Sequence, residues 1–246
     1  MNVFAMTTVR DESFIISDTL DCWGEIAIEV FVYGDDSRDA TPSICRTHPK
    51  VREYLTSNLY DPDRERMEWY KRQALFNSLK RFCEQGDWIC LFDADEHLDF
   101  FRPEILQDDS LACIHCRSWD FYITPEDEHL DREELWCPDY RERQWVSPQP
   151  RQFPFFIRFD PRLRWWYPNQ HNPDRDKQMG ETVVHGSVKH WGKGYSKGLY
   201  DRKKQYYAEE WGTEFGRSYA GNDAIKEDYT DDHGNPLIKY EDIVHV

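Results

Sequence analysis

The chain has 246 residues and a formal net charge of -16 at pH 7. Because so acidic a surface repels nucleic acid phosphates, a general role in binding DNA or RNA is not expected. Aromatic residues make up 15% of the chain, which is enough for a large core and is not typical of a disordered protein. We expect a main domain over residues 1–212 and an acidic C-terminal extension over residues 213–246.

The lengths of the apolar runs and the spacing of the cysteines indicate in which cellular compartment the protein is expected. No run reaches the length that spans a bilayer, so no transmembrane segment is expected. The N-terminal residues turn polar at Thr7 and Arg10, which is not typical of a signal peptide. The 7 cysteines have irregular spacing, which favours a reducing, cytoplasmic location over a disulfide scaffold.

Hydrophobic patterns predict strands and helices in an alternating order. The predicted strands are residues 3–9, 26–33, 88–92, 113–119, 153–159 and 182–190. The predicted helices are residues 13–20, 63–85, 126–136 and 200–211. Residues 45–63 are expected to be irregular because they contain Pro49 and Pro62. A strand–helix–strand succession implies a parallel sheet, so the predicted fold class is α/β.

Three acids, Asp93, Asp95 and Glu96, follow the apolar run 88–92. Crowded carboxylates repel one another unless positive charge lies between them. Mg²⁺ or Mn²⁺ would supply it, since both prefer oxygen ligands, and open α/β sheets bind ligands beyond the carboxyl ends of their strands. Taken alone, the stretch is equally consistent with a solvated acidic turn before the next helix.

Acids also follow the first two predicted strands, in Arg10-Asp11-Glu12 and Asp35-Asp36-Ser37. If these strands are neighbours of the third in a parallel sheet, all three loops open at one edge. With a metal, that edge suits a nucleotide: Asp35 or Asp36 would accept a hydrogen bond from the base and Asp93 from the ribose. Asp95 would hold a cation that offsets the charge on a leaving diphosphate.

Four segments resemble the motifs of family-2-like glycosyltransferases. Residues 10–12 resemble the Lys-Asn-Glu start of that family, with Asp11 in place of Asn, and residues 34–41 resemble its Asp-x-x-Ser-x-Asp-x-Thr loop. Gln73 and Asn77 are one helical turn apart, as in the helix before the family's metal-binding strand. Residues 87–96 resemble its Asp-Trp-(apolar)-Asp-x-Asp-Glu signature. The resemblance covers the first 100 residues or so, and the C-terminal half matches only loosely.

The resemblance implies a GT-A fold, with a Rossmann-like, mostly parallel sheet flanked by helices. It implies a nucleotide-sugar-binding half over residues 1–100 and an acceptor half over residues 101–212. It also implies a nucleoside diphosphate sugar as donor, with a UDP-sugar as the first expectation, and Mn²⁺ or Mg²⁺. The candidate metal ligands are Asp93, Asp95 and His190. The candidate donor-binding residues are Thr8, Arg10, Glu12, Asp36, Arg72, Gln73, Asp93 and Lys193.

Residues 188–195 resemble the His-x-Gly-Tyr segment that closes the donor site in many relatives. His190 would bind the metal through a neutral imidazole, or is an ordinary residue at a strand end. Lys193 would reach the diphosphate from a glycine-rich loop. In agreement, Lys and Arg outnumber Asp and Glu between residues 151 and 204, which favours a confined anion site.

Transfer to an acceptor hydroxyl with inversion needs a general base, for which Glu181 and Asp120 are the main candidates; each could equally be a surface acid. Aromatic rings that could stack on sugars, or pack in the core, are Trp119, Trp165, Trp166 and Tyr167. Cys113 and Cys116 bracket His115, but a structural zinc needs four ligands and no second pair follows, so buried cysteines are expected.

The predicted function is therefore a metal-dependent, hexosyltransferase-like enzyme that moves a sugar from a nucleotide donor to a carbohydrate or other hydroxyl acceptor. One alternative is a non-catalytic protein on the same fold that binds a carbohydrate or nucleotide. The other is a metal-dependent phosphohydrolase that uses Asp93 and Asp95. Against it, common phosphatases carry such a pair on their first strand, followed by Thr or Val, whereas Glu96 follows here.

Overall fold

The structure, a computed structural model, describes residues 1–57, 63–127, 129–130, 139–165, 180–210 and 224–243. The chain divides into two compact units. Unit 1 consists of Met1–Arg117 and Gln152–Val188, and unit 2 consists of Ser118–Arg151 and Lys189–Val246. The predicted boundaries near residues 100 and 212 stay predictions.

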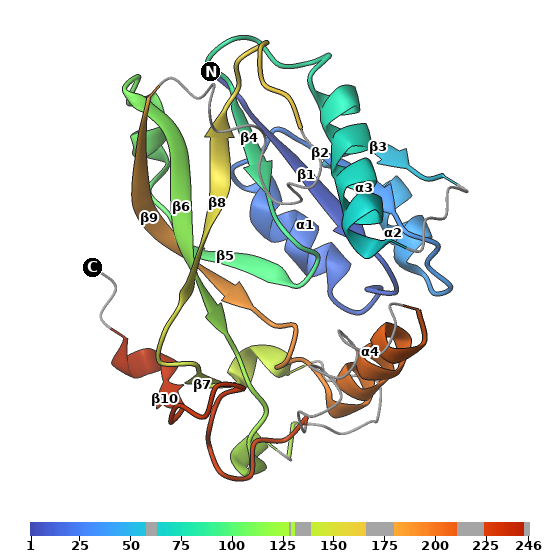
Figure 1. The fold of residues 1–246 in the computed structure, drawn as a ribbon, viewed down its shortest axis with the longest axis vertical. Coiled ribbons are helices and arrows are strands. Elements are labelled where there is room, and N and C mark those ends of the chain that lie inside the picture. Colours follow the sequence, from blue (N-terminus) through green and yellow to red (C-terminus); the bar gives the residue numbers. More distant parts are fainter. Residues whose placement is uncertain (58–62, 128, 131–138, 166–179, 211–223, 244–246) are drawn as a thin grey trace. The chain divides into compact units, whose positions relative to one another are not determined.

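The described residues form an eight-stranded sheet in the order β3-β2-β1-β4-β8-β6-β9-β5 (Figure 1). Its strands are β1 Val3–Val9, β2 Glu29–Gly34, β3 Val51–Leu55, β4 Trp88–Leu91, β5 Glu96–Phe100, β6 Leu111–Asp120, β8 Arg151–Arg158 and β9 Glu181–His190. Neighbouring strands from β3 to β4 are parallel, and β8 runs antiparallel to β4. The parallel strands of the sheet therefore all come from the N-terminal half of the chain.

Helices cover both faces of this parallel part. They are α1 Ile16–Gly24, α2 Thr41–Thr47 and α3 Arg64–Leu79, and a 3₁₀ turn, η1, spans Pro103–Gln107. Val3 and Ala5 of β1 share one apolar cluster with Trp23 of α1, while Phe4 of the same strand shares the opposite cluster with Phe76 of α3. Because side chains alternate along a strand, β1 is buried on both faces. The predicted α/β class, a mostly parallel sheet flanked by helices, is confirmed.

Some predicted boundaries were wrong. The strand predicted from residue 26 begins at Glu29, because the backbone N–H of Ala27 still donates to Trp23 O at the end of α1. The helix predicted over residues 63–85 ends at Leu79. Residues 45–63, predicted to be irregular, include the end of α2 and the whole of β3. Pro49 lies before β3 and does not interrupt its ladder with β2.

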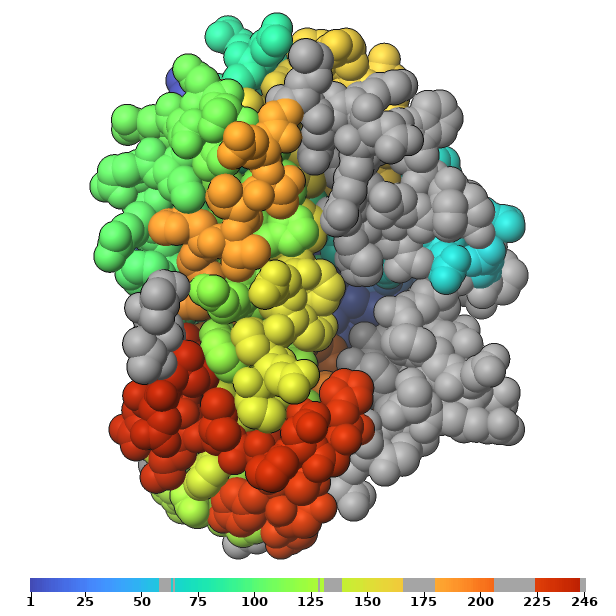
Figure 2. Space-filling model, turned by 60° about the vertical axis from the view of Figure 1, so that its left-hand side comes forward, coloured from blue at the N-terminus to red at the C-terminus, as the bar shows by residue number. Residues whose placement is uncertain are grey.

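Unit 2 contains helix α4 Lys197–Glu210 and a two-stranded ladder. The short strands β7 Trp145–Val146 and β10 Ile238–Lys239 pair antiparallel. Three 3₁₀ turns complete the described part: η2 Pro125–Asp127, η3 Tyr140–Glu142 and η5 Tyr240–Asp242. Within the described part of the C-terminal segment, residues 224–243, Ile238 and Lys239 thus pair with β7, and Figure 2 shows the segment in red as a continuous surface patch.

Part of the predicted helix over residues 126–136, and also Trp166 and Tyr167, lie outside the described residues. Among the described residues, no helix combines the length and the apolar character needed to cross a membrane.

Candidate functional site

The carboxyl ends of β2, β1 and β4 lie side by side in unit 1. Thr8 pairs with Tyr33 across β1 and β2, and Met6 pairs with Leu91 across β1 and β4. The loops that follow these strands therefore open at one edge of the sheet, where ligands bind in open α/β folds. Thr8 lies half-buried at this edge, next to the loop that starts at Arg10.

Hydrogen bonds join the first of these loops to the second. Asp11 N donates to Ser37 Oγ over 3.1 Å, and Arg38 N donates back to Asp11 Oδ1 over 2.6 Å. Asp11 and Asp36 each adopt a left-handed backbone with φ of 52°, a conformation that Asp tolerates better than most residues. The Asp at position 11, where the resembled family has Asn, thus serves to fix the neighbouring loop.

Two more bonds extend this connection. Glu12 N donates to Thr41 Oγ1 over 2.8 Å, and Ser13 N donates to Asp39 Oδ2 over 3.0 Å. Burial raises the pKa of Asp39, but hydrogen bonds from Thr41 and Ser13 lower it more, so that the pKa lies below its ordinary value. The Ser, Asp and Thr of the resembled loop motif are therefore accounted for by contacts that hold the two loops together.

Two adjacent cations on α3 hold the acids of the second and third loops. Lys71 Nζ donates to Asp35 Oδ2 over 2.7 Å, and Arg72 Nη2 donates to Asp93 Oδ1 over 2.8 Å. Both basic side chains are buried, at 2% and 7% exposed, whereas Asp93 is 49% exposed. Arg10 Nη1 lies 3.9 Å from Asp35, at the outer limit of an ion pair. Consecutive residues of α3 thus tie the second and third loops to the same helix.

The acids around Arg72 favour its charged form. Burial lowers the pKa of Arg72, but Asp93, Glu68 and Glu96 raise it more, so that the pKa lies above its ordinary value. The Lys71 contact could not be read from the sequence as a site feature. Its only signal was its place beside Arg72, two positions before Gln73, on the helix that precedes the acidic strand end.

The acidic turn after β4 is anchored by α1. Thr19 Oγ1 donates to Ala94 O over 2.6 Å, and Trp23 Nε1 donates to Glu96 O over 2.7 Å. Glu96 is buried and its Oε2 accepts from Asp93 N over 2.8 Å, so it closes the turn. Asp95 is only 6% exposed. The turn is therefore fixed to α1, with Asp95 buried and Asp93 half exposed.

The donor set of this turn fits a hard cation. Among the described residues, no group of three or more His, Cys, Asp or Glu side chains could hold a metal ion by itself. Mg²⁺ is usually bound by one or two carboxylates together with water and substrate phosphates. Asp93 and Asp95 are the carboxylates predicted for this role, which stays a prediction; the Arg72 bond uses Oδ1 of Asp93, so that Oδ2 remains an acceptor.

The two cysteines that could suggest zinc are separated by the sheet. Cys116 packs in the apolar cluster on the α1 face, and Cys113 packs in the cluster on the α3 face. Both are buried, and neither is in a disulfide. Since side chains three apart on a strand point to opposite faces, the two sulfurs do not share a ligand, and the expectation of buried cysteines is confirmed.

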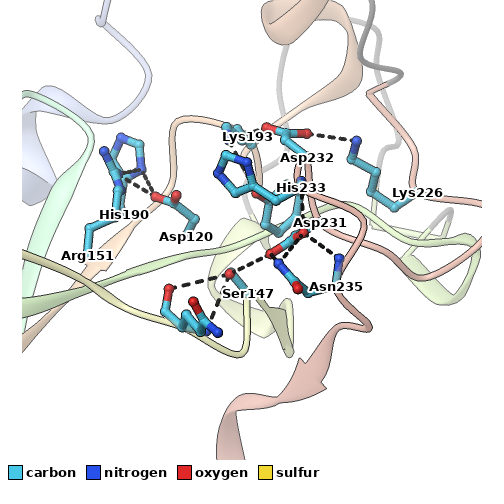
Figure 3. A network of polar contacts seen from close by, with 12 residues as sticks. Asp120, Ser147, Arg151, His190, Lys193, Lys226, Asp231, Asp232, His233 and Asn235 are labelled. Atoms are coloured by element: carbon cyan, nitrogen blue, oxygen red, sulfur yellow. Dashed lines mark hydrogen bonds and ion pairs between the residues drawn. The ribbon is translucent and has the colours of Figure 1, made fainter.

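Unit 2 brings together Asp120 at the end of β6, His190 at the end of β9 and Arg151 at the start of β8 (Figure 3). Asp120 Oδ1 lies 2.5 Å from both His190 Nδ1 and Arg151 Nη2. Burial raises the pKa of Asp120, but His190 and Arg151 lower it more, to well below its ordinary value. A carboxylate held in this way is a weak proton acceptor. The predicted roles of Asp120 as base and His190 as metal ligand stay predictions.

Lys193, predicted to bind the diphosphate, is engaged within unit 2 by a C-terminal acid. Its Nζ forms an ion pair with Asp232 and donates to the Tyr122 hydroxyl over 3.2 Å. The other carboxylate oxygen of Asp232 lies 2.8 Å from Lys226 Nζ (Figure 3). Sequence reasoning missed Asp232 because no local pattern links residues so far apart in the chain.

The remaining candidates lie as follows. Glu181 begins β9 and is exposed, Asp36 is exposed in the second loop, and Gln73 is half-buried on α3. Trp119 and Trp165 are only 6% and 3% exposed, so core packing explains them better than stacking on a sugar. The roles of Glu181, Asp36 and Gln73 stay predictions.

Comparisons with known proteins give likenesses among solved structures only, since no family model and no curated protein matches the chain. Glucosyl-3-phosphoglycerate synthase from Mycobacterium tuberculosis, in complex with Mn²⁺, UDP and glucosyl-3-phosphoglycerate, is 13% identical with a TM-score of 0.31 over 48% of this chain and 44% of that one. A mycobacterial protein is 16% identical with a TM-score of 0.31 over 53% and 43%. A 4-diphosphocytidyl-2C-methyl-D-erythritol synthase is 11% identical with a TM-score of 0.33 over 64% and 75%. The chain covers less than half the length of the first two, and likenesses of this size assign no role to its residues.

Proposed function

We propose that the chain is a metal-dependent glycosyltransferase that moves a sugar from a UDP-sugar to a hydroxyl group of a carbohydrate or other acceptor. One observation carries the proposal: Lys71 and Arg72, adjacent on α3, each bind an acid that follows a parallel strand, Asp35 after β2 and Asp93 after β4. Nucleotides bind at this edge in open α/β sheets. The four motif segments, which resemble those of GT-A-type enzymes, support the same function.

The proposed donor site uses groups of unit 1. Asp35 or Asp36, in the second loop, accepts a hydrogen bond from the base. Asp93 accepts from the ribose through Oδ2, because Arg72 already takes Oδ1. The bonds between the first and second loops fix the base-binding acids before any ligand arrives, so that little ordering is left to oppose binding.

Asp93 and Asp95 would hold Mn²⁺ or Mg²⁺, and this cation supplies positive charge against the leaving diphosphate. Arg72 holds Asp93 in place, since its Nη2 donates to Asp93 Oδ1 over 2.8 Å. Thr19 and Trp23 fix the backbone carbonyls on either side of Asp95. The chain's own residues therefore set the position of both acids.

The proton of the acceptor hydroxyl needs a base in an inverting transfer. Glu181 and Asp120 remain the two candidates, and the structure distinguishes their surroundings. Asp120 is held by Arg151 and His190, which suits an orienting group better than a base, whereas Glu181 is exposed at the start of β9. Comparing Glu181→Gln with Asp120→Asn at saturating donor separates them, because loss of the base lowers kcat.

The direct test is release of UDP from a panel of UDP-sugars, measured with Mn²⁺ and again with EDTA. We expect release that depends on metal, and its loss in Asp95→Asn. Asp108→Asn is the matched control, because this acid is exposed and bonds to Ser110 away from the strand-end loops. Binding of UDP with Mn²⁺ but no turnover of any donor would favour the non-catalytic alternative. Hydrolysis of simple phosphate esters that is lost in Asp95→Asn would favour the phosphohydrolase.

A further inference from the structure

Two lysines of unit 2 share one carboxylate. Lys193 Nζ, in the loop after β9, forms an ion pair with Oδ2 of Asp232, and Lys226 Nζ lies 2.8 Å from Oδ1 of the same acid (Figure 3). Lys226 and Asp232 belong to the C-terminal segment, and all three residues lie in unit 2. Two positive charges thus meet one negative charge, so these three side chains together are positively charged.

The ring of Tyr122 lies against both lysines. The Nζ of Lys193 is 5.1 Å from the ring centroid, and the Nζ of Lys226 is 5.8 Å from it. Lys193 Nζ also donates to the Tyr122 hydroxyl over 3.2 Å. Tyr122 is only 2% exposed, so the surrounding core holds its ring in place. Because cation–π contacts attract both ammonium groups to the ring, they help to keep the lysines together without Asp232.

The lysines stay charged and within reach of a small anion. Burial lowers the pKa of Lys193, but Tyr122, Asp120 and Asp232 raise it more, so that the pKa lies above its ordinary value. The side chains of Lys193 and Lys226 are 18% and 11% exposed, and that of Asp232 is 10% exposed. The cluster is therefore largely desolvated but not closed to solvent.

The backbone next to Asp232 is held by a different acid. Oδ1 of Asp231 accepts from the backbone N–H groups of His233 and Asn235, and its Oδ2 accepts from Ser147 Oγ over 2.9 Å (Figure 3). Rotation of the Asp232 side chain away from the lysines breaks two ion pairs but none of these hydrogen bonds. The lysines can therefore exchange one anion for another without unfolding of this loop.

A phosphate group suits two ammonium groups better than a carboxylate does. It carries a charge of about -1.5 to -2 at pH 7 and has three strong acceptor oxygens. Lysine binds phosphate as a point charge, so it needs no fixed planar geometry. Stability alone does not account for the second lysine, because the desolvation of a largely buried ion pair offsets most of its attraction.

We propose that Lys193 and Lys226 form a phosphate-binding site, which the carboxylate of Asp232 occupies when no ligand is bound. The phosphate displaces this carboxylate, and its oxygens accept from both ammonium groups. Two sources share this chemistry. One is the diphosphate of the nucleotide donor, and this assignment rests on the proposed function. The other is a phosphate group of a different ligand, which does not depend on that function.

The first test is calorimetric titration of the full chain with inorganic pyrophosphate, in EDTA and without nucleotide. We expect the parent to bind, and Lys193→Met and Lys226→Met each to weaken binding about tenfold, as for the loss of one hydrogen bond to a charged group. Asp232→Asn should strengthen binding about tenfold, because it removes the competing charge. Lys239→Met is the control, since it removes the same charge from a lysine of unit 2 that packs on Trp145 instead.

Titration with UDP in Mn²⁺ then identifies the source of the phosphate. A weaker Kd for UDP in Lys226→Met assigns the site to the donor diphosphate. An unchanged Kd for UDP, together with weaker pyrophosphate binding in the same variant, assigns it to a different ligand. If UDP does not bind the parent at all, the proposed function fails, whereas the pyrophosphate titration still decides whether this site exists.

Two results would overturn the proposal. The first is no binding of pyrophosphate by the parent. The second is equal binding by the parent, Lys193→Met and Lys226→Met, or an equal loss in Lys239→Met, while thermal melting shows each variant folded. If a variant of Lys193 or Lys226 does not fold, Asp232→Asn decides instead, and pyrophosphate binding no tighter than that of the parent contradicts the proposal.

Discussion

Arg72 Nη2 donates a hydrogen bond to Asp93 Oδ1 over 2.8 Å, from a buried helix position to a half-exposed carboxylate at the end of β4. The neighbouring Lys71 makes the equivalent contact with Asp35 at the end of β2. A single turn of α3 thus holds two acids that come from different loops. If the strand-end edge binds a nucleotide, the fixed orientation of these acids matters more than their number.

Replacing Arg72 tests that relationship. In Arg72→Met the carboxylate of Asp93 loses its fixed orientation, and we expect the Kd for UDP in Mn²⁺ to rise roughly fivefold, which corresponds to about 1 kcal/mol. This is less than a buried bond to a charged group contributes, because solvent weakens the bond to a half-exposed acid. Calorimetry measures the Kd. Arg81→Gln is the control, since it removes an exposed ion pair with Glu53 after the end of α3 and should leave the Kd unchanged. An unchanged Kd in Arg72→Met would mean that Asp93 does not contact the ligand.

Thr41 joins the first two loops. In Thr41→Val the buried Glu12 N–H loses its acceptor at nearly constant side-chain volume, and we expect the free energy of unfolding to fall by about 1–2 kcal/mol. Urea denaturation measures this. Thr47→Val is the control, because Thr47 is exposed and bonds only to carbonyls of its own helix; a change within about 0.5 kcal/mol is expected. Equal effects of the two substitutions would show that the contact between the loops adds nothing to stability.

Asp231 should make the stability of unit 2 depend on pH. Its Oδ1 accepts from the backbone N–H groups of His233 and Asn235, and its Oδ2 accepts from Ser147 Oγ over 2.9 Å (Figure 3). Burial raises the pKa of Asp231, but these hydrogen bonds lower it more. Since the folded-state pKa lies below the unfolded value of about 3.9, the stabilisation is present above that pH and is lost as the pH falls through the folded-state pKa.

We therefore expect Asp231→Asn to lower the free energy of unfolding by about 1–2 kcal/mol at pH 7, and this difference from the parent to shrink steadily below about pH 4. Urea denaturation at a series of pH values measures both. Asp242→Asn, at an exposed acid of the same segment, controls for the loss of one negative charge. A difference that stays constant from pH 7 into the acid range would show that ionisation of Asp231 plays no part.

The sequence predicted those parts of the fold that are buried on both faces. Residues 88–92 form a continuous apolar run and residues 3–9 a largely apolar one, and β1 and β4 lie where these runs predict, because central parallel strands exclude water on both sides. The edge strand β3 was missed. Its residues Val51–Leu55 are only partly buried, so they lack the apolar run that marks a central strand.

The positions of candidate site residues could be predicted where these residues directly follow a strand. Contacts between residues far apart in the sequence could not be predicted. Asp93 and Asp95 follow an apolar run, so parallel pairing alone places them at the sheet edge. Asp232 and Lys193 meet only after the chain has folded, and neither segment carries a pattern that points to the other. The burial of aromatic residues could not be predicted, because the sequence does not distinguish a buried tryptophan such as Trp165 from a half-exposed one such as Trp145.

The measurement that tests the central claim most directly is calorimetric titration of UDP into the protein with Mn²⁺ and, separately, with EDTA, for the parent chain and Asp95→Asn. We predict binding by the parent only when Mn²⁺ is present, and its loss in the folded Asp95→Asn variant, because the buried acid at the end of β4 carries the metal. Binding of equal strength in EDTA, or no binding by the parent in either condition, would contradict the account.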